Sequence, residues 1–494
     1  MVFYLIMRAA NKIAKNTIVS TLAEIVNKVI SIYLYIRLAN YLMDSGFGQF
    51  STIVTLCVFF QIIASFGLDK LIIREISKNV KTTYEYLKNS LKIKLVLGLG
   101  AYFLLVGCIL LMHKPEIVVL GTVLYGLCIF FINVSDSYMA VFNAHERLEI
   151  NSFILVIVKL FIFSLVLTFI HFNAGLIQVL SAFLIGEIIR TGLFVFIFHV
   201  KLAKKVKSRT CATINKFKIL KKATPFVIVN IAWVIYMKID IIMLSTIKGD
   251  QAVGWYSAAA ILLIGLMFIS RCYTLSVFPA LSRYARDSKE LLSFSWNKSV
   301  KFLFLISFPL AVGIYLLSDR IIALLYDVTA YSNSINALKI LIITLPMFFT
   351  NSINMFLFYA LEKQKQATNI VLTCTACNII LNVILIPKYS FVGAAYATLF
   401  AQALNVSLFF GYAYFYLSMR PKMSKLILKA SIACLFMGLL LIKIHGYNLF
   451  MISMLSAIVY LFVLIVLKTF DKDEIKIFKG IEKVFLSKIK GIIS

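Results

Sequence analysis

Ten ionisable residues lie inside long apolar stretches of this 494-residue chain. The six cations are Lys28, Arg37, Lys159, Arg190, Lys238 and Arg271, and the four acids are Glu24, Asp136, Glu187 and Asp240. A charge at the centre of a bilayer costs about 2.5 to 3.5 kcal/mol, so such residues normally face a cavity or a partner. Because Lys and Arg bind phosphates through charge-assisted hydrogen bonds, the excess of cations favours an anionic substrate over a cationic one.

Local pairing is the alternative explanation for some of these charges. Glu24 precedes Lys28 by four residues and Glu187 precedes Arg190 by three, so each pair can neutralise itself on one helix face. Lys238 and Asp240 are two residues apart and need partners on other helices. Near the ends of their segments, Arg37 and Lys159 could instead extend their side chains towards the membrane surface.

The acids suggest a second role for the interior. A carboxylate in a membrane cavity can take up H⁺ or Na⁺ and so favour one conformation of a transporter. We assign this role to Glu24, Asp136 and Asp240, while structural pairing is the main alternative for Glu187.

The composition requires a membrane to hold these residues. With 61% hydrophobic and 14% charged residues, the chain cannot form a soluble surface. A spanning helix needs about 20 mostly apolar residues, and this length predicts an all-α integral membrane protein with about 14 spans. The predicted spans are 16–39, 49–67, 93–112, 116–138, 152–170, 175–199, 224–247, 252–278, 301–318, 337–360, 366–386, 390–416, 425–442 and 447–467.

The remaining cations predict the orientation of the chain. Lys and Arg number 50 against 21 Asp and Glu, which gives a net charge of +29. Thirty-eight of the 50 fall in one alternating set of connections that includes both termini, and six fall in the other set. Cytoplasmic loops carry the excess of Lys and Arg, so we expect both termini in the cytoplasm of a bacterial inner (cytoplasmic) membrane. Cations that punctuate apolar runs argue against nucleic-acid binding.

An internal repeat indicates a duplicated architecture. Residues 44–51 (DSGFGQFS) return as residues 250–257 (DQAVGWYS), 206 positions later. We therefore predict two six-helix lobes around a central cavity, related by an axis along the membrane normal. The expected segments are a first lobe at 1–199, a basic cytoplasmic linker at 200–223, a second lobe at 224–416, two further helices at 417–467 and a basic amphipathic cytoplasmic tail at 468–494.

Four stretches carry a family resemblance. They are residues 37–78 (from RLANYLMDSGFGQF to REISK), 236–244 (YMKIDIIML) with 253–259 (VGWYSAA), 278–282 (FPALS) and 386–397 (IPKYSFVGAAYA). These resemble the polysaccharide transporters (Wzx-type O-antigen flippases) of the multidrug, oligosaccharidyl-lipid and polysaccharide exporter superfamily. The resemblance implies alternating access that moves an undecaprenyl-pyrophosphate-linked oligosaccharide from the cytoplasmic to the periplasmic leaflet. It implies membrane lipids, a polysaccharide polymerase and a chain-length regulator as partners.

Other functions fit the residues less well. The paired cysteines Cys374 and Cys377 lie in an uncharged segment without a second pair, so we expect no metal, cofactor or catalytic residue. An O-antigen polymerase would need a large outer loop, and the longest predicted outward connection, 319–336, is short. A multidrug cation antiporter would need a cavity of the opposite sign. A lipid II flippase would also have a cationic cavity and stays open as an alternative.

Overall fold

The computed structural model describes residues 2–203, 216–421, 423–444 and 446–471. Within these residues all regular secondary structure is helical, which confirms the predicted all-α membrane architecture. The helices are α1 (Val2–Ser65), α2 (Leu68–Lys78), η1 (Val80–Thr82), α3 (Thr83–Leu111), α4 (Glu116–Gly126), α5 (Cys128–Ala144), α6 (Leu148–His171), α7 (Leu176–Phe198), η2 (His199–Ala203), α9 (Lys216–Lys248), α10 (Asp250–Asp287), α11 (Lys289–Leu316), α12 (Ser318–Leu325), α13 (Val328–Tyr331), α14 (Ser334–Ile343), α15 (Leu345–Ala360), α16 (Gln364–Leu417), α17 (Ser424–Lys443) and α18 (Leu449–Val466).

Eleven helices in the described part of the chain are long and apolar enough to cross a membrane, or twelve if the bent pair α14 and α15 forms one span. The predicted number of fourteen is therefore not confirmed. Two of the long helices contain a break in the backbone, at Met43 in α1 and at Ser390 in α16. These breaks fall where the sequence separates spans 16–39 from 49–67 and 366–386 from 390–416.

Several predicted connections are helical. The expected connection at 68–94 holds α2, η1 and the start of α3, and the one at 279–301 is almost entirely the end of α10 and the start of α11. Ser288 separates those last two helices and caps the second, since its Oγ accepts a hydrogen bond from the Leu291 amide. Charged residues can extend a helix beyond the apolar layer, and hydropathy alone places the helix end too early.

The chain forms two compact units. The first comprises residues 1–268, 325–337 and 365–401, and the second comprises 269–324, 338–364 and 402–494. The prediction of two lobes with a boundary at 200–223 stays a prediction. Residues 204–215 of the expected linker and 472–494 of the expected tail lie outside the described residues.

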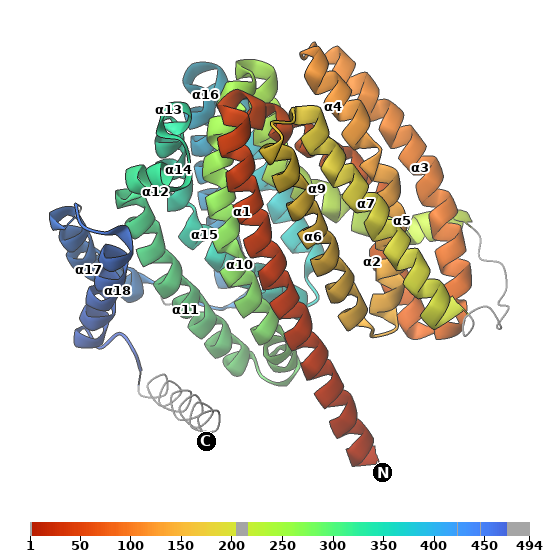
Figure 1. Cartoon of the computed structure of the whole chain (residues 1–494). Coiled ribbons are helices and arrows are strands. Elements are labelled where there is room, and N and C mark those ends of the chain that lie inside the picture. Colours follow the sequence, from red (N-terminus) through yellow and green to blue (C-terminus); the bar gives the residue numbers. More distant parts are fainter. Residues whose placement is uncertain (1, 204–215, 422, 445, 472–494) are drawn as a thin grey trace, which may run out of the picture. The chain divides into compact units, whose positions relative to one another are not determined.

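Helix α1 organises the first unit. It packs against α3, α4, α6 and α9, while α7 packs against α4, α5 and α6 (Figure 1). Leu34, Leu38 and Ala39 of α1 are fully buried in this packing. The long α1 therefore brings helices from both copies of the repeat into one unit.

The two copies of the repeated motif meet face to face in the first unit. A Cβ atom added to Gly48 would clash with the main-chain carbonyl of Asp250, and one added to Gly254 would clash with the carbonyl of Asp44. Gln251 Nε2 also donates to Asp44 Oδ2 at 2.8 Å. Both positions therefore need glycine, because the backbones of the two motifs approach too closely for a side chain. The glycine of each motif contacts the backbone of the other motif.

Two further hydrogen bonds are accepted by carbonyls that are 206 residues apart, although their donors are not equivalent positions. The Tyr331 hydroxyl donates to the carbonyl of Ala39 at 2.8 Å. Lys114 Nζ donates to the carbonyl of Ser245, the position equivalent to Ala39, at 2.7 Å, and forms an ion pair with Asp250 at 2.9 Å. We name these contacts, together with those of Gly48 and Gly254, the repeat contact.

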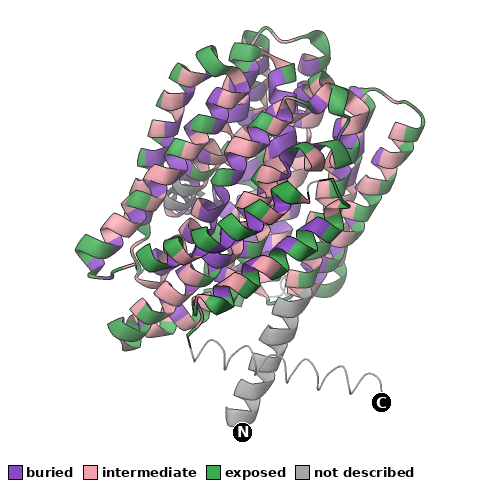
Figure 2. Ribbon diagram, turned by 90° about the vertical axis from the view of Figure 1, so that its left-hand side faces the viewer, coloured by how far each residue is buried: buried purple, intermediate pink, exposed green. Residues whose placement is uncertain are grey.

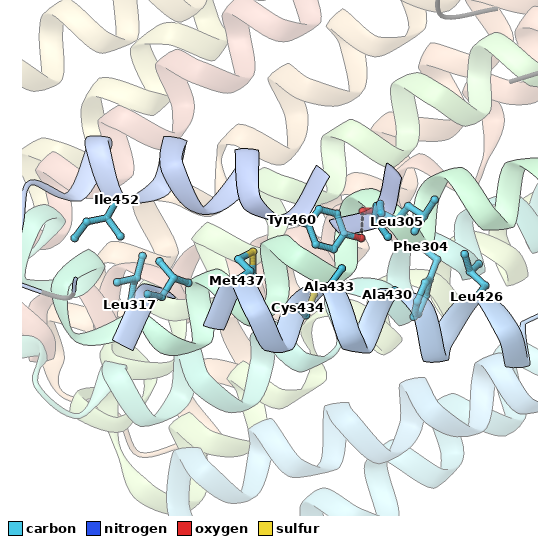
Figure 3. Close-up of a cluster of buried hydrophobic side chains, with 12 residues drawn as sticks. Phe304, Leu305, Leu317, Leu426, Ala430, Ala433, Cys434, Met437, Ile452 and Tyr460 are labelled. Carbon is cyan, nitrogen blue, oxygen red and sulfur yellow. Dashed lines mark hydrogen bonds between the residues drawn. The ribbon is translucent and has the colours of Figure 1, made fainter. Parts of the chain in front are cut away.

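In the second unit, α17 and α18 pack on each other and on α11 (Figure 3). Helix α17 presents Ala430, Ala433, Cys434, Met437 and Leu441 at helical spacing, and all are buried. The Tyr460 hydroxyl of α18 donates to the Leu305 carbonyl at 2.9 Å. Because lipid is as apolar as these side chains, close packing of small residues and this hydrogen bond hold the three helices together.

Many large apolar side chains face outward. Figure 2 shows exposed residues along the outer faces of helices whose inner faces are buried. Phe450 and Phe462 of α18, for example, are 80% and 64% exposed. Such surfaces suit contact with lipid, and the chain is a multi-pass membrane protein.

Candidate functional site

The first unit contains nine of the ten predicted site residues, all except Arg271. Arg190 on α7 is the centre of one group. Its Nη1 donates to Glu187 Oε2 at 3.0 Å, one turn earlier on the same helix, and its Nη2 is ion-paired with Asp136 on α5. The guanidinium also lies 6.0 Å from the centre of the Phe194 ring. Local pairing of Glu187 with Arg190 is therefore present, and Asp136 adds a second acid.

A neighbouring ion pair was missed in the sequence. Lys94 on α3 is 1% exposed, and its Nζ donates to Asp69 Oδ1 at 2.5 Å and to the carbonyl of Asn133 at 3.2 Å. Asp69 lies in the first turn of the amphipathic helix α2 and interacts electrostatically with Asp136. Sequence reasoning counted Lys94 with the basic connection 68–94. Lys94 lies inside the apolar run that begins at Ile93, and this position could have identified it as an interior residue.

Three lysines form a second group. Lys28 on α1 interacts electrostatically with Lys159 on α6 and with Lys238 on α9. All three are partly buried, and α1 packs against both partner helices. In the described part of the chain neither Lys159 nor Lys238 makes an ion pair with an acid. We call Lys28, Lys159 and Lys238 the lysine cluster.

The lysine cluster adjoins the arginine group. Lys159 interacts electrostatically with Glu187 as well as with Lys28. The interior charges of the first unit therefore form one continuous network that runs from α3 through α5 and α7 to α6, α1 and α9. Two acids pair with Arg190, whereas three cations come together at the end of the network at α1, α6 and α9, and this excess of positive charge suits an anionic ligand.

Asp240 on α9 occupies a separate buried site and is 3% exposed. Its carboxylate accepts hydrogen bonds from Tyr256 at 2.8 Å, from Thr398 at 2.7 Å and from Asn382 Nδ2 at 2.6 Å. Asn382 also donates to Asn378 Oδ1 at 3.1 Å, and its own Oδ1 is buried without a hydrogen-bond partner. Neutral groups alone thus surround this carboxylate, and no cation in the described residues pairs with it.

The other three predicted residues are exposed. Glu24 and Arg37 are exposed on α1. Arg271 is exposed on the part of α10 that belongs to the second unit. The residues Tyr256, Asn378, Asn382 and Thr398 were not singled out from the sequence, because neutral polar side chains in a span give no hydropathy signal.

Comparisons with known proteins agree with these features. A model of the family described as polysaccharide biosynthesis protein matches residues 13–285, and the MatE model matches residues 225–385. The "Putative O-antigen transporter" of Shigella flexneri is 24% identical over 402 residues, which cover 78% of this chain and 93% of that protein. The "Probable low-salt glycan biosynthesis flippase Agl15" of Haloferax volcanii is 24% identical over 204 residues, 40% of this chain and 42% of that protein.

Solved structures share the fold. The lipid II flippase MurJ in an inward closed conformation superposes with a TM-score of 0.73 at 18% identity, covering 91% of this chain and 98% of that one. An inward-facing multidrug resistance MATE transporter superposes with a TM-score of 0.65 at 15% identity, covering 82% and 96%. The two family-model matches and the O-antigen transporter relative, together with this shared fold, define a member of the multidrug, oligosaccharidyl-lipid and polysaccharide exporter superfamily. Within it, the chain belongs to the polysaccharide biosynthesis protein family, as its motifs predicted.

Proposed function

We propose that this protein is a flippase for lipid-linked polysaccharide units. Its substrate is an undecaprenyl-pyrophosphate-linked O-antigen or another polysaccharide repeat unit, which it moves from the cytoplasmic to the periplasmic leaflet by alternating access. The family match and the relatives named O-antigen transporter and glycan flippase support the class of substrate. A lipid II flippase stays the second candidate, since the MurJ fold covers nearly the whole chain.

The lysine cluster is the observation on which the proposal rests. Three lysines from α1, α6 and α9 share one region of the membrane interior, and their combined positive charge attracts an anion. A pyrophosphate supplies that anion and accepts charge-assisted hydrogen bonds from the ammonium groups. A cationic drug would meet repulsion at the same place, so the sign of the cluster disfavours multidrug export.

Arg190 has a different part in this proposal. Because Asp136 and Glu187 already neutralise it, we assign it to holding α5 and α7 together beside the cluster rather than to the first contact with pyrophosphate. Arg37 and Arg271 remain predicted contacts for the pyrophosphate or for acidic sugars. A polysaccharide polymerase and a chain-length regulator remain predicted partners.

Complementation tests the substrate. We would express the chain in hosts that lack either their O-antigen flippase or their lipid II flippase, and measure surface polysaccharide and growth. Lys159→Gln and Lys238→Gln should each reduce export at least about tenfold, because a hydrogen bond to a charged group contributes about 1.5 to 3 kcal/mol. Lys92→Gln, at an exposed position on α3, is the matched control. Normal export by the double variant at normal protein levels would exclude the cluster as the binding site.

We also propose that Asp240 couples transport to H⁺ or Na⁺. Its oxygen atoms, together with those of Thr398, Tyr256 and Asn382, provide the oxygen ligands that hard cations prefer, and protonation would equally relieve its buried charge. Glu24, Asp136 and Glu187 remain predicted contributors to coupling.

Transport into liposomes under imposed pH and Na⁺ gradients separates coupling from binding. Asp240→Asn should abolish the stimulation by the gradient while leaving slow equilibration of the substrate. Asp287→Asn, at an exposed position near the end of α10, should behave like the unchanged protein. Transport by the unchanged protein that does not respond to either gradient would refute the coupling.

A further inference from the structure

The second unit contains a basic cavity that the transport proposal does not use. Its volume is about 790 Å³, within the range of small-molecule sites. It lies where the start of α11, the connection from α16 to α17, the start of α17 and the residues after α18 come together. Six cations and two acids line it: Lys289, Lys298, Lys301, Arg420, Lys425 and Lys429, with Glu290 and Asp471.

Three of the cations hold the chain that follows α18. Lys301 Nζ donates to the Thr469 carbonyl at 2.7 Å, and Lys429 Nζ donates to the Lys468 carbonyl at 3.0 Å. Lys298 is ion-paired with Asp471, and this hydrogen bond holds the pKa of the Asp471 carboxyl below its usual value. One wall of the cavity is therefore fixed by contacts of its own.

Two other cations of the cavity keep their positive charge. In the described residues Arg420 and Lys425 are exposed and have no acidic partner, and the Arg420 guanidinium lies 5.5 Å from the centre of the Tyr414 ring. Lys289 interacts electrostatically with Glu290. Because cations outnumber acids three to one around the cavity, the cavity suits an anionic ligand.

Apolar side chains adjoin the charges. Phe294, Met419 and Leu426 line the same cavity, and Phe294 is 58% exposed. From the cavity, α17 and α18 extend with apolar outer faces, on which Leu428, Leu435 and Phe462 are more than half exposed. A ligand with an anionic head and hydrocarbon chains matches this arrangement, and basic pockets between helices on the cytoplasmic side bind phospholipid head groups.

We infer that this cavity binds the phosphate head group of an anionic phospholipid of the inner leaflet. The three segments that form it, 279–301, 417–429 and the chain after α18, belong to the connections predicted to be cytoplasmic, and the inference uses that orientation. The lipid would join α11 to α17 and α18 as a structural ligand. It is independent of the transported substrate, whose proposed site lies in the first unit.

Native mass spectrometry of the full-length protein tests the site, with dioleoyl phosphatidylglycerol and tetraoleoyl cardiolipin as probes and dioleoyl phosphatidylcholine as the neutral comparison. The unchanged protein should retain the anionic lipids selectively. The variant R420Q/K425Q should lose at least about tenfold of that occupancy, because each Lys or Arg near the surface contributes to binding of anionic lipid. The matched control K88Q/K92Q removes two exposed lysines from α3 of the first unit and should bind normally.

Three results would overturn the inference. The first is equal occupancy by anionic lipid in R420Q/K425Q and in the control, and the second is equal retention of the neutral lipid. The third is displacement of phosphatidylglycerol by geranylgeranyl pyrophosphate at equimolar concentration, because this would make the cavity a site for the transported lipid. A melting temperature of R420Q/K425Q within a few degrees of the control excludes misfolding. If this variant does not fold, the single variant K425Q should still show a severalfold loss of occupancy, and its absence would equally count against the site.

Discussion

Lys94 is 1% exposed, and its charge is balanced by Asp69 and by the carbonyl of Asn133. Removing one partner of a buried ion pair leaves the other charge uncompensated and costs about 3 to 5 kcal/mol, whereas removing both can be nearly neutral. We therefore predict that Lys94→Met lowers the free energy of unfolding by about 3 kcal/mol, and that adding Asp69→Asn restores most of it.

Thermal unfolding in detergent measures this effect. The control is Lys92→Met, two residues earlier on α3, where the side chain is exposed and the melting temperature should not change. If K94M and K92M melt together, the buried pair does not stabilise the first unit as its geometry suggests.

The sequence predicts which charged residues lie in the membrane interior, because they interrupt apolar runs. The apolar runs around Arg190, Lys159 and Lys238 identified them as interior residues, but which acid pairs with which cation depends on contacts between helices. Arg190 lies beside Asp136, 54 residues away, which no spacing rule predicts. The neutral residues around Asp240 carry no charge at all, so only the packing of α9, α10 and α16 reveals that site.

At the scale of the helices, His145 connects two elements at the corner between α5 and α6. Its Nε2 lies 3.0 Å from Thr83 Oγ1 at the start of α3. Burial first, and the charge of Arg147 second, lower the pKa of His145 below its ordinary value of 6.5. The unfolded chain therefore takes up a proton at a higher pH than the folded chain, and the folded protein loses stability as the pH falls through about 6.5.

We predict that the melting temperature falls between pH 7.5 and pH 5.5, and that His145→Gln reduces this fall, since glutamine does not titrate. His171→Gln serves as the control, because His171 is exposed at the end of α6. An identical pH dependence in H145Q and the unchanged protein would exclude His145 as a contributor.

The helices themselves were well predicted in position and poorly in their ends. The positions of the spans could be predicted because each one needs a long apolar run. The helix breaks at Met43 and Ser390 occur near Gly46 and Pro387, where the hydropathy pattern already divided one predicted span from the next. Helix α2 was expected as part of a connection, yet its buried residues Leu68, Leu71, Ile72 and Ile76 recur at helical spacing. Its eleven residues are too short to span a membrane, so a search for spans does not find it.

At the scale of the molecule, the repeat predicted from residues 44–51 and 250–257 has a structural counterpart. The two copies contact each other through their glycines, and equivalent carbonyls of Ala39 and Ser245 each accept a hydrogen bond from the other repeat. Sequence identity between the copies indicated the duplication. The contact between the two copies could not be inferred from the sequence. The constant offset shows which positions are equivalent, but it does not show which surfaces come into contact.

The repeat contact leads to the last prediction. Gly48→Ala and Gly254→Ala each place a methyl group against a main-chain carbonyl, which cannot rotate away as a side chain can. Since overpacking costs about 1 to 3 kcal/mol, each variant should melt several degrees lower. Under the proposed alternating access, the contact lies at the predicted periplasmic end and must form and separate in every cycle. Both variants should therefore also transport more slowly, by about tenfold.

The matched controls are Gly107→Ala and Gly313→Ala, where the added methyl group meets no atom within 4 Å. They should retain the transport rate of the unchanged protein and melt at the same temperature or slightly higher, because alanine favours a helix over glycine. Transport and unfolding have to be measured on the same preparations. A G48A variant that melts and transports like G107A would show that the close approach of Gly48 to Asp250 has no energetic weight, and a variant that melts lower but transports normally would separate stability from the transport cycle.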